Sequence, residues 1–314
     1  MLKLRFQTDD CIFCMSRSRR HRIGPALVRR AGLAKWLSYS HSLTLSGQRF
    51  VIPIREGVGE ELLKLEPDFK SQMIGYFGAG LPDTFIDIGA NLGQTIVEAF
   101  SVRRWKSYFA LEPNPDVCAY LEALVGLNGL PVQILPWASG PMATPHRFSM
   151  QGRGDASATL APEGRPGVYS SEMSRWVATY PLDMLLDMTA LPRGLMIKID
   201  VEGFEAGVLQ GASRVLDEVR PIILCEVLRA YTQSALEHTH HRMGLLEEIL
   251  SRHRYRIFYI EMQKADPAII HGLREMRSFP RGLWKDNPTG FDYCFMPAEA
   301  QMPQSGHFAL SVLD

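Results

Sequence analysis

The chain has 314 residues, 46% of them hydrophobic, so it can bury a large core and is not a disordered protein. Its 34 Lys and Arg balance 34 Asp and Glu, which leaves no overall field to attract nucleic acid or an anionic membrane. Without a membrane-length apolar run or a secretory signal, and with five cysteines lacking framework spacing, we expect a soluble, cytoplasmic protein with no nucleic-acid partner and no transmembrane segment.

Residues 1–42 are expected to be a partly disordered N-terminal arm. Its stretch 17–35 carries seven basic side chains and no acidic one. This stretch is either a solvated segment or a contact for an anionic partner. Cys11 and Cys14 have redox or half-zinc spacing, but no second close pair completes four ligands, so we predict no metal site there.

Residues 43–82 are predicted to form a hairpin and a helical cap. Ser46-Gly47 supplies a tight turn between two apolar runs. Apolar residues then recur at helical spacing from Glu60 to Phe77, and Pro67 is expected to divide this segment into two helices.

From Thr84 onward, strand and helix patterns alternate, which is typical of an α/β fold with a mostly parallel, doubly wound sheet. We expect one domain over 83–300, a flap insertion at 139–176 near the substrate, and a C-terminal tail at 301–314. An antiparallel pair is expected to finish the sheet. The predicted strands span 84–88, 108–111, 132–136, 195–199, 222–227, 256–260 and 293–296.

The first of these strands runs into a Gly-x-x-x-Gly turn, Gly89 to Gly93, that opens a helix. Such glycines let the backbone approach a ligand, and the new helix N-terminus offers amides to a carboxylate. Asp87 is positioned to bind an ammonium group or a water. Glu112, at the end of the next strand, is positioned to accept hydrogen bonds from both hydroxyls of a ribose. Similar turns and acidic strand ends also occur in α/β proteins that bind nothing.

Six motifs follow one another along the chain, namely Phe85 to Gln94, Glu112-Pro113-Asn114, Ala178 to Leu186, Ile197 to Glu205, Leu209-x-Gly211-Ala212 and Cys225-Glu226-Val227. These motifs, in this order, resemble the FkbM family of S-adenosylmethionine-dependent methyltransferases. The resemblance covers roughly residues 43–297 and implies a class I methyltransferase (Rossmann-like) fold with a seven-stranded sheet, which binds S-adenosylmethionine at the carboxyl ends of its first two strands.

The same resemblance implies the cofactor-binding residues. Glu112 would hold the ribose, with Pro113 and Asn114 beside the adenosine. Trp137, Ala138 and Ser139 would meet the adenine edge, although Trp137 could equally be core packing. The amino-acid part of the cofactor would be surrounded by Asp87, Gly89, Ala90, Asn91 and Gly93, with Gln94 next in the same turn.

O-methyl transfer, the activity associated with the family, requires an acceptor oxygen aligned with an activated methyl and a group that helps remove its proton. Asp200 is our expected base, with Glu202 orienting the acceptor or fixing the loop, and Glu226 ends the neighbouring strand. Alternatively, Asp200 and Glu202 only cap the helix that follows. Lys198 is expected to form an ion pair with an acidic neighbour. A divalent metal shared by the three carboxylates is conceivable but not predicted.

The sequence therefore predicts a methyltransferase that modifies a hydroxyl on a sugar, glycan or small metabolite. The alternative is a catalytically weak, cofactor-binding scaffold that docks a partner. A nicotinamide-dependent dehydrogenase is disfavoured by the Gly-x-x-x-Gly turn. His238, His240 and His241 belong either to a solvated helix or, in one case, to the acceptor side of the site.

Overall fold

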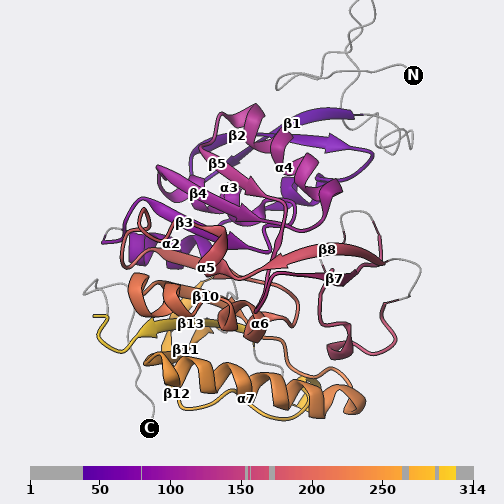
Figure 1. Ribbon diagram of the computed structural model, residues 1–314. Coiled ribbons are helices and arrows are strands. Elements are labelled where there is room, and N and C mark those ends of the chain that lie inside the picture. The colour runs from indigo at the N-terminus through magenta and orange to yellow at the C-terminus, as the bar shows by residue number, and fades with distance from the viewer. Residues whose placement is uncertain are drawn as a thin grey trace, which may run out of the picture.

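The computed structural model describes residues 38–301, except 79, 153, 154, 156, 170–173, 264–268 and 287–289. Its centre is an eight-stranded sheet with helices on both faces (Figure 1), in which all strands but β12 and β13 run parallel. In spatial order the strands are β12 (Ile270–Met276), β11 (Tyr255–Met262), β13 (Asp292–Pro297), β10 (Ile222–Glu226), β9 (Met196–Ile199), β3 (Thr84–Ile88), β4 (Ser107–Leu111) and β5 (Val132–Leu135).

The central strands carry apolar residues at consecutive positions, so both of their faces must be buried. Helices therefore cover both faces of the sheet. Phe85 packs on one face, and Ile86 and Ile88 on the other. One face is covered by α2 (Phe69–Gly78), α3 (Gln94–Val102) and α4 (Pro115–Asn128), and the other by α5 (Leu182–Leu185), α6 (Glu205–Gln210) and α7 (Leu236–Arg252).

The α/β class, the doubly wound sheet and its antiparallel last strand are confirmed. The expected number of strands is wrong, because β12 adds an eighth at the edge of the sheet. As an edge strand β12 is buried at only part of its length, so His271 and Arg274 interrupt the apolar pattern that would have revealed it.

The cap packs against α4 at one end of the molecule (Figure 1). Strands β1 (Ser38–Leu45) and β2 (Gln48–Arg55) form the predicted hairpin around Ser46-Gly47, and Pro67 separates the 3-10 helix η2 (Glu60–Lys64) from α2. The hairpin begins at Ser38, five residues before the expected boundary at 43, because buried Tyr39 extends the pairing to Arg55. The rest of the predicted arm, including Cys11, Cys14 and the basic stretch, lies outside the described residues, as does the predicted tail after residue 301.

The flap insertion forms a small sheet of its own beside the main one (Figure 1). It contains β6 (Ala138–Ser139), β7 (Thr144–Ser149) and β8 (Ser174–Tyr180), in the order β6-β8-β7. Phe148, Met150, Leu160 and Val177 form its apolar interior. The flap is therefore a packed unit that can present side chains to the neighbouring strand ends.

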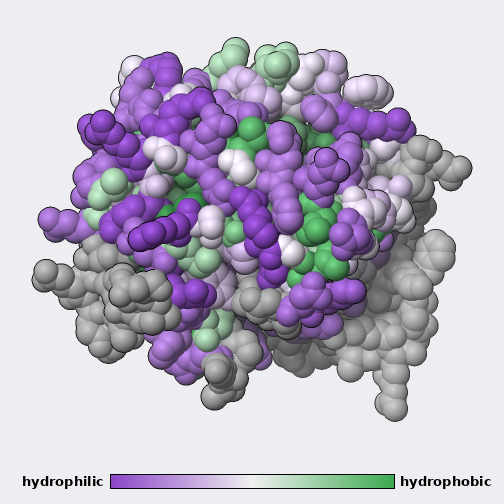
Figure 2. All heavy atoms as spheres, turned by 90° about the horizontal axis from the view of Figure 1, so that it is seen from below, coloured by the Kyte–Doolittle hydropathy of each residue, from purple (hydrophilic) through white to green (hydrophobic). Residues whose placement is uncertain are grey.

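The opposite end of the molecule carries α7, and this face is mostly hydrophilic with small, separated apolar patches (Figure 2). His238 and His240 are half-buried on α7 and His241 is exposed. Among the described residues, no helix combines the length and the apolar character needed to cross a membrane.

Candidate active site

A cavity of about 240 Å³, here called the main cavity, lies at the carboxyl ends of β3, β4 and β9 beneath the flap. Ligands of open α/β sheets bind at this edge. The flap contributes Phe148, Asp155 and Leu160 to the wall. Most of the expected cofactor-binding residues line the main cavity, namely Gly89, Ala90, Asn91, Gln94, Glu112, Pro113, Asn114 and Ala138.

Asp87 lies behind this wall, and the structure corrects its expected role. Its side chain is fully buried, with one carboxylate oxygen 3.3 Å from Lys198 Nζ and the other accepting a hydrogen bond of 2.9 Å from the Tyr108 hydroxyl. The ammonium that Asp87 was expected to take from a ligand is supplied by Lys198. The ion pair predicted for Lys198 is thereby confirmed, and Asp87 acts by holding that lysine in place.

Close contacts at both ends of the turn require glycine. Gly89 has φ 80°, and a Cβ there would collide with the carbonyl oxygen of Asp200, so only glycine lets the two strand-end loops meet. Gly93, with φ 89°, precedes α3, and a Cβ there would lie 2.7 Å from Leu124 Cδ2. Gly93 does not line the main cavity; it allows α3 to pack closely against α4.

Glu112 is buried in the cavity wall with part of its hydrogen-bonding capacity unused. One carboxylate oxygen accepts 3.0 Å from the Asn91 amide, and the other accepts 2.8 Å from the Asn114 amide. A carboxylate has about four acceptor sites, so about two are left for a pair of ligand hydroxyls. Burial raises the pKa of Glu112 to about 7, against the opposing effect of the two amides.

The end of the cavity formed by β6 can accommodate a flat ring. Trp137 lines it and lies edge-on to Tyr180 at 5.6 Å, so Trp137 serves both packing and the cavity wall. Ser139 also lines it, and its buried hydroxyl has no hydrogen-bond partner within the described part of the chain. Buried hydroxyls are normally paired, so this atom indicates a bound polar ligand. Glu112 and Ser139 together fit a nucleoside.

At the other end of the cavity lies Asp200, which shares a hydrogen bond with Glu226 at the end of the neighbouring strand β10. Burial, followed by the charge of Asp200, raises the pKa of Glu226 to about 10, so Glu226 carries the proton. Burial would also raise the pKa of Asp200, but Lys198, 3.5 Å away, and the hydrogen bond from Glu226 outweigh it and hold that pKa below its usual value. Asp200 is the ionised member of the pair at neutral pH.

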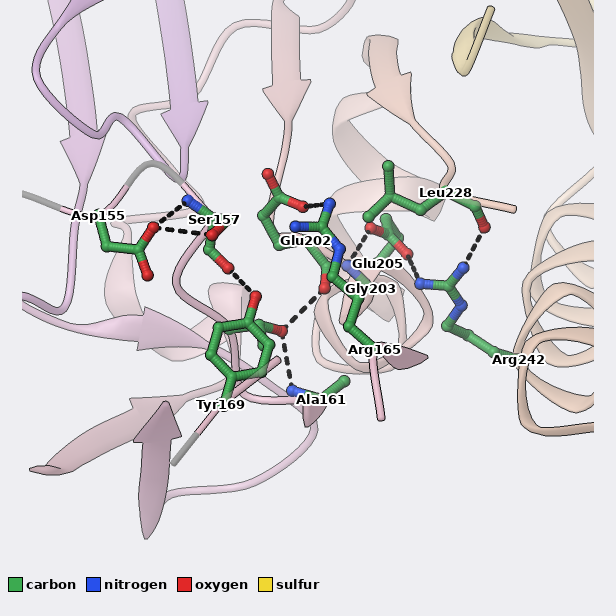
Figure 3. A network of polar contacts seen from close by, with 11 residues as sticks. Asp155, Ser157, Ala161, Arg165, Tyr169, Glu202, Gly203, Glu205, Leu228 and Arg242 are labelled. Atoms are coloured by element: carbon green, nitrogen blue, oxygen red, sulfur yellow. Dashed lines mark hydrogen bonds and ion pairs between the residues drawn. The ribbon is translucent and has the colours of Figure 1, made fainter. Parts of the chain in front are cut away.

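Glu202 belongs to a network that fastens the flap to the loop after β9 (Figure 3). Its carboxylate accepts a hydrogen bond of 2.5 Å from Arg165, and its carbonyl accepts one of 2.8 Å from Thr159. Burial raises the pKa of Glu202 to about 7 despite Arg165. Of the two roles expected for Glu202, the contacts favour fixing the loop.

The network continues on the far side of the loop. Glu205 accepts from the Gly203 amide at 2.8 Å and from Arg242 of α7 at 3.3 Å, and Arg242 also donates to the Leu228 carbonyl (Figure 3). It is therefore Glu205 that ties the start of α6, whereas no capping bond from Asp200 or Glu202 to α6 is found among the described residues.

Asp200, Glu202 and Glu226 each place a carboxylate oxygen within 4.8 Å of the other two. Hard oxygen ligands of this kind could hold a divalent cation. Two features already satisfy these groups without an ion, since protonated Glu226 donates a hydrogen bond to Asp200 and Arg165 pairs with Glu202.

Sequence reasoning missed several residues of the site. Lys70 of α2 lines the main cavity, yet it occupies an ordinary polar position of an amphipathic helix and gives no signal in the sequence. Arg165 and Asp155 lie in the long insertion, where only the folded structure brings them to the strand ends. Cys225 and Cys294 are buried free thiols and do not line the main cavity.

Comparison with known proteins identifies the family of the chain. Residues 87–257, more than half of the chain, match the model of the Methyltransferase FkbM domain. The hexuronic acid methyltransferase AglP of Haloferax volcanii is 28% identical over 144 residues, which are 45% of this chain and 55% of that protein. The chain thus spans about half the length of this curated relative.

Among solved structures, the methyltransferase FkbM from Methylobacillus flagellatus KT is 18% identical, with a TM-score of 0.40 over 64% of this chain and 46% of that one. The precorrin-6y C5,15-methyltransferase from Geobacter metallireducens GS-15 is 12% identical, with a TM-score of 0.33 over 72% of this chain and 85% of that one. On the strength of the matched domain, the chain belongs to the FkbM family of methyltransferases.

Proposed function

We propose that the protein is an S-adenosylmethionine-dependent methyltransferase that methylates a hydroxyl of a sugar, glycan or small metabolite. The observation that carries this proposal is the pairing, within one cavity, of a ribose-type carboxylate at Glu112 with an ionised carboxylate at Asp200. The hexuronic acid methyltransferase relative supports a sugar as the acceptor.

The chain offers suitable contacts along the length of this cofactor. Glu112 would accept hydrogen bonds from the two ribose hydroxyls, and Trp137 and Ser139 would form the wall at the adenine end. The backbone of the turn at Gly89 to Asn91, followed by Gln94 at the start of α3, receives the amino-acid end. When bound, S-adenosylmethionine supplies a methyl group already activated by its sulfonium.

Asp200 is the proposed base. The acceptor oxygen becomes strongly acidic as its bond to carbon forms, so even a weakly basic carboxylate such as Asp200 can take the proton late in the step. Glu226, already protonated, holds Asp200 in place with its hydrogen bond, and Lys198 keeps Asp200 ionised before transfer. Arg165 and Glu202 hold the flap over the cavity and so limit the access of water.

A screen with methyl-labelled S-adenosylmethionine tests the proposal. The purified protein is incubated with labelled donor and fractionated metabolites or glycans, and each fraction is analysed for label. We expect one class of hydroxylated compound to gain the label as a methyl ether. Label on nitrogen or carbon would contradict O-methylation, and saturable donor binding without any transfer would favour the scaffold alternative.

The proposed location is the cytoplasm. Its support is the state of the cysteines, because Cys118, Cys225 and Cys294 are free thiols in the described part of the chain.

A further inference from the structure

A second cavity of about 210 Å³, here called the side cavity, lies next to the main one, between the sheet and α2. Lys70, Lys198 and Asp200 line both cavities. A molecule in the side cavity would therefore lie against the same Asp200 carboxylate that faces the main cavity. This is the position required of a group that receives a methyl from a donor in the main cavity.

The floor of the side cavity is a row of carboxyl groups from three adjacent strands. Asp200 directly follows β9, Glu226 ends β10 and Asp292 begins β13. In the sheet register Glu226 lies directly opposite Asp292, so their side chains share one face. The row arises because β13 is antiparallel, which brings its first residue to the edge where the parallel strands end.

Asp292 differs from its two neighbours because its carboxyl group makes no hydrogen bond or ion pair with any described residue. Asp200 and Glu226 are bonded to each other. Burial raises the pKa of Asp292 to about 7, with Lys70 opposing. Asp292 is half-buried and lines the side cavity, so its free acceptor sites are available to a ligand there.

The remaining walls restrict the chemistry of that ligand. Lys70 and Lys198 place two ammonium groups against the carboxyl row, so the side cavity does not favour a cationic acceptor such as an amine. Phe69 contributes an apolar surface beside Lys70.

We propose that the side cavity binds the methyl acceptor as a single sugar ring, with Asp292 as the residue that selects it by accepting hydrogen bonds from two adjacent ring hydroxyls. The inference rests on the proposed function and adds the place and class of the acceptor. The ring lies against Phe69, and the hydroxyl to be methylated lies beside Asp200. Asp292 therefore governs acceptor affinity and not donor affinity.

The test uses the p-nitrophenyl glycosides of glucose, galactose, glucuronic acid and galacturonic acid as acceptors, with methyl-labelled S-adenosylmethionine as donor. Wild type is compared with Asp292→Asn, which keeps the size of the side chain. Asp217→Asn is the matched control, because Asp217 is an exposed residue that pairs with His253 away from both cavities. Donor affinity is measured by calorimetry on the same preparations and shows that each variant is folded.

We expect at least one glycoside to be methylated, and Asp292→Asn to raise its KM by about tenfold while donor affinity stays unchanged. An unchanged KM in Asp292→Asn overturns the role of Asp292. Failure of all four glycosides, together with a non-sugar acceptor in the labelled screen, overturns the sugar assignment but leaves the methyltransferase proposal standing. Failure of transfer to every compound in both experiments would instead reject the proposed function itself.

Discussion

Binding of S-adenosylmethionine should depend on pH through Glu112. The pKa of this carboxyl is raised by burial to about 7, and both of its oxygens already accept backbone amides. Only the ionised form keeps acceptor sites for both ribose hydroxyls, so protonation of Glu112 opposes binding. Because the pKa of the free protein is raised, affinity is lost as the pH falls through about 7.

The size of the effect follows from that value. If bound cofactor holds the pKa of Glu112 well below 5.5, lowering the pH from 7.5 to 5.5 weakens binding by about 25-fold, or about 2 kcal/mol. Glu112→Ala should flatten this dependence and weaken binding at pH 7.5 by about 1–3 kcal/mol, since two ribose hydrogen bonds are lost.

Isothermal titration calorimetry at several pH values, in buffers of different ionisation enthalpy, measures both the affinity and the protons released. Glu202→Gln is the informative control, because the pKa of Glu202 is also raised to about 7 although its carboxylate is engaged by Arg165. This variant should keep the pH dependence. A dependence that disappears in Glu202→Gln and persists in Glu112→Ala would refute the assignment of Glu112 to the ribose.

Three further outcomes are expected. Glu226→Gln should keep most of the transfer rate, because its amide can still donate to Asp200, whereas Glu226→Ala should lower kcat by about 10- to 100-fold; equal losses would contradict the donor role. Arg165→Ala should release the flap and speed limited proteolysis within residues 150–176 by about tenfold, and an unchanged cleavage rate would refute the fastening role. Gly89→Ala should lower the free energy of unfolding in urea by more than about 3 kcal/mol, because a Cβ at Gly89 would collide with the Asp200 carbonyl. Gly126→Ala, on the open surface of α4, should raise it by up to about 1 kcal/mol. Similar effects at the two glycines would refute the steric role of Gly89.

Local patterns predicted much of the fold. The helix α4 begins at Pro115 and ends before Gly129, residue types typical of these helix positions, and the Asn114 side chain accepts a hydrogen bond from the Asp116 amide. Such cap residues depend only on the neighbouring residues, so they mark helix ends whatever the overall fold. The edge strand β12 was missed because half-buried strands carry weaker patterns.

The residues that line the main cavity were predicted from the sequence better than those that line the side cavity. Glu112 and Gly89 lie at strand ends, where sequence position and spatial position coincide. Asp87 shows the limit of this reasoning, because its partner Lys198 comes from a strand more than a hundred residues away. No sequence pattern decides whether a buried carboxylate meets a ligand or another side chain.

Asp292 could have been found from a signal that is present in the sequence. Asp292 directly precedes the strand predicted at 293–296, which was expected to be antiparallel, and this places Asp292 at the same sheet edge as Asp200 and Glu226. Lys70 and Arg165 have no such signal, since each reaches the site from a segment whose packing is set by distant contacts.

The proposed function is best tested by comparing methyl transfer in wild type and Asp200→Asn with methyl-labelled S-adenosylmethionine and the acceptor found in the screen. We expect an O-methyl product from wild type, a rate lower by about 10²- to 10⁴-fold in Asp200→Asn, and donor affinities that agree within about threefold. Equal rates in the two proteins, or donor binding without transfer by wild type, would contradict this mechanism.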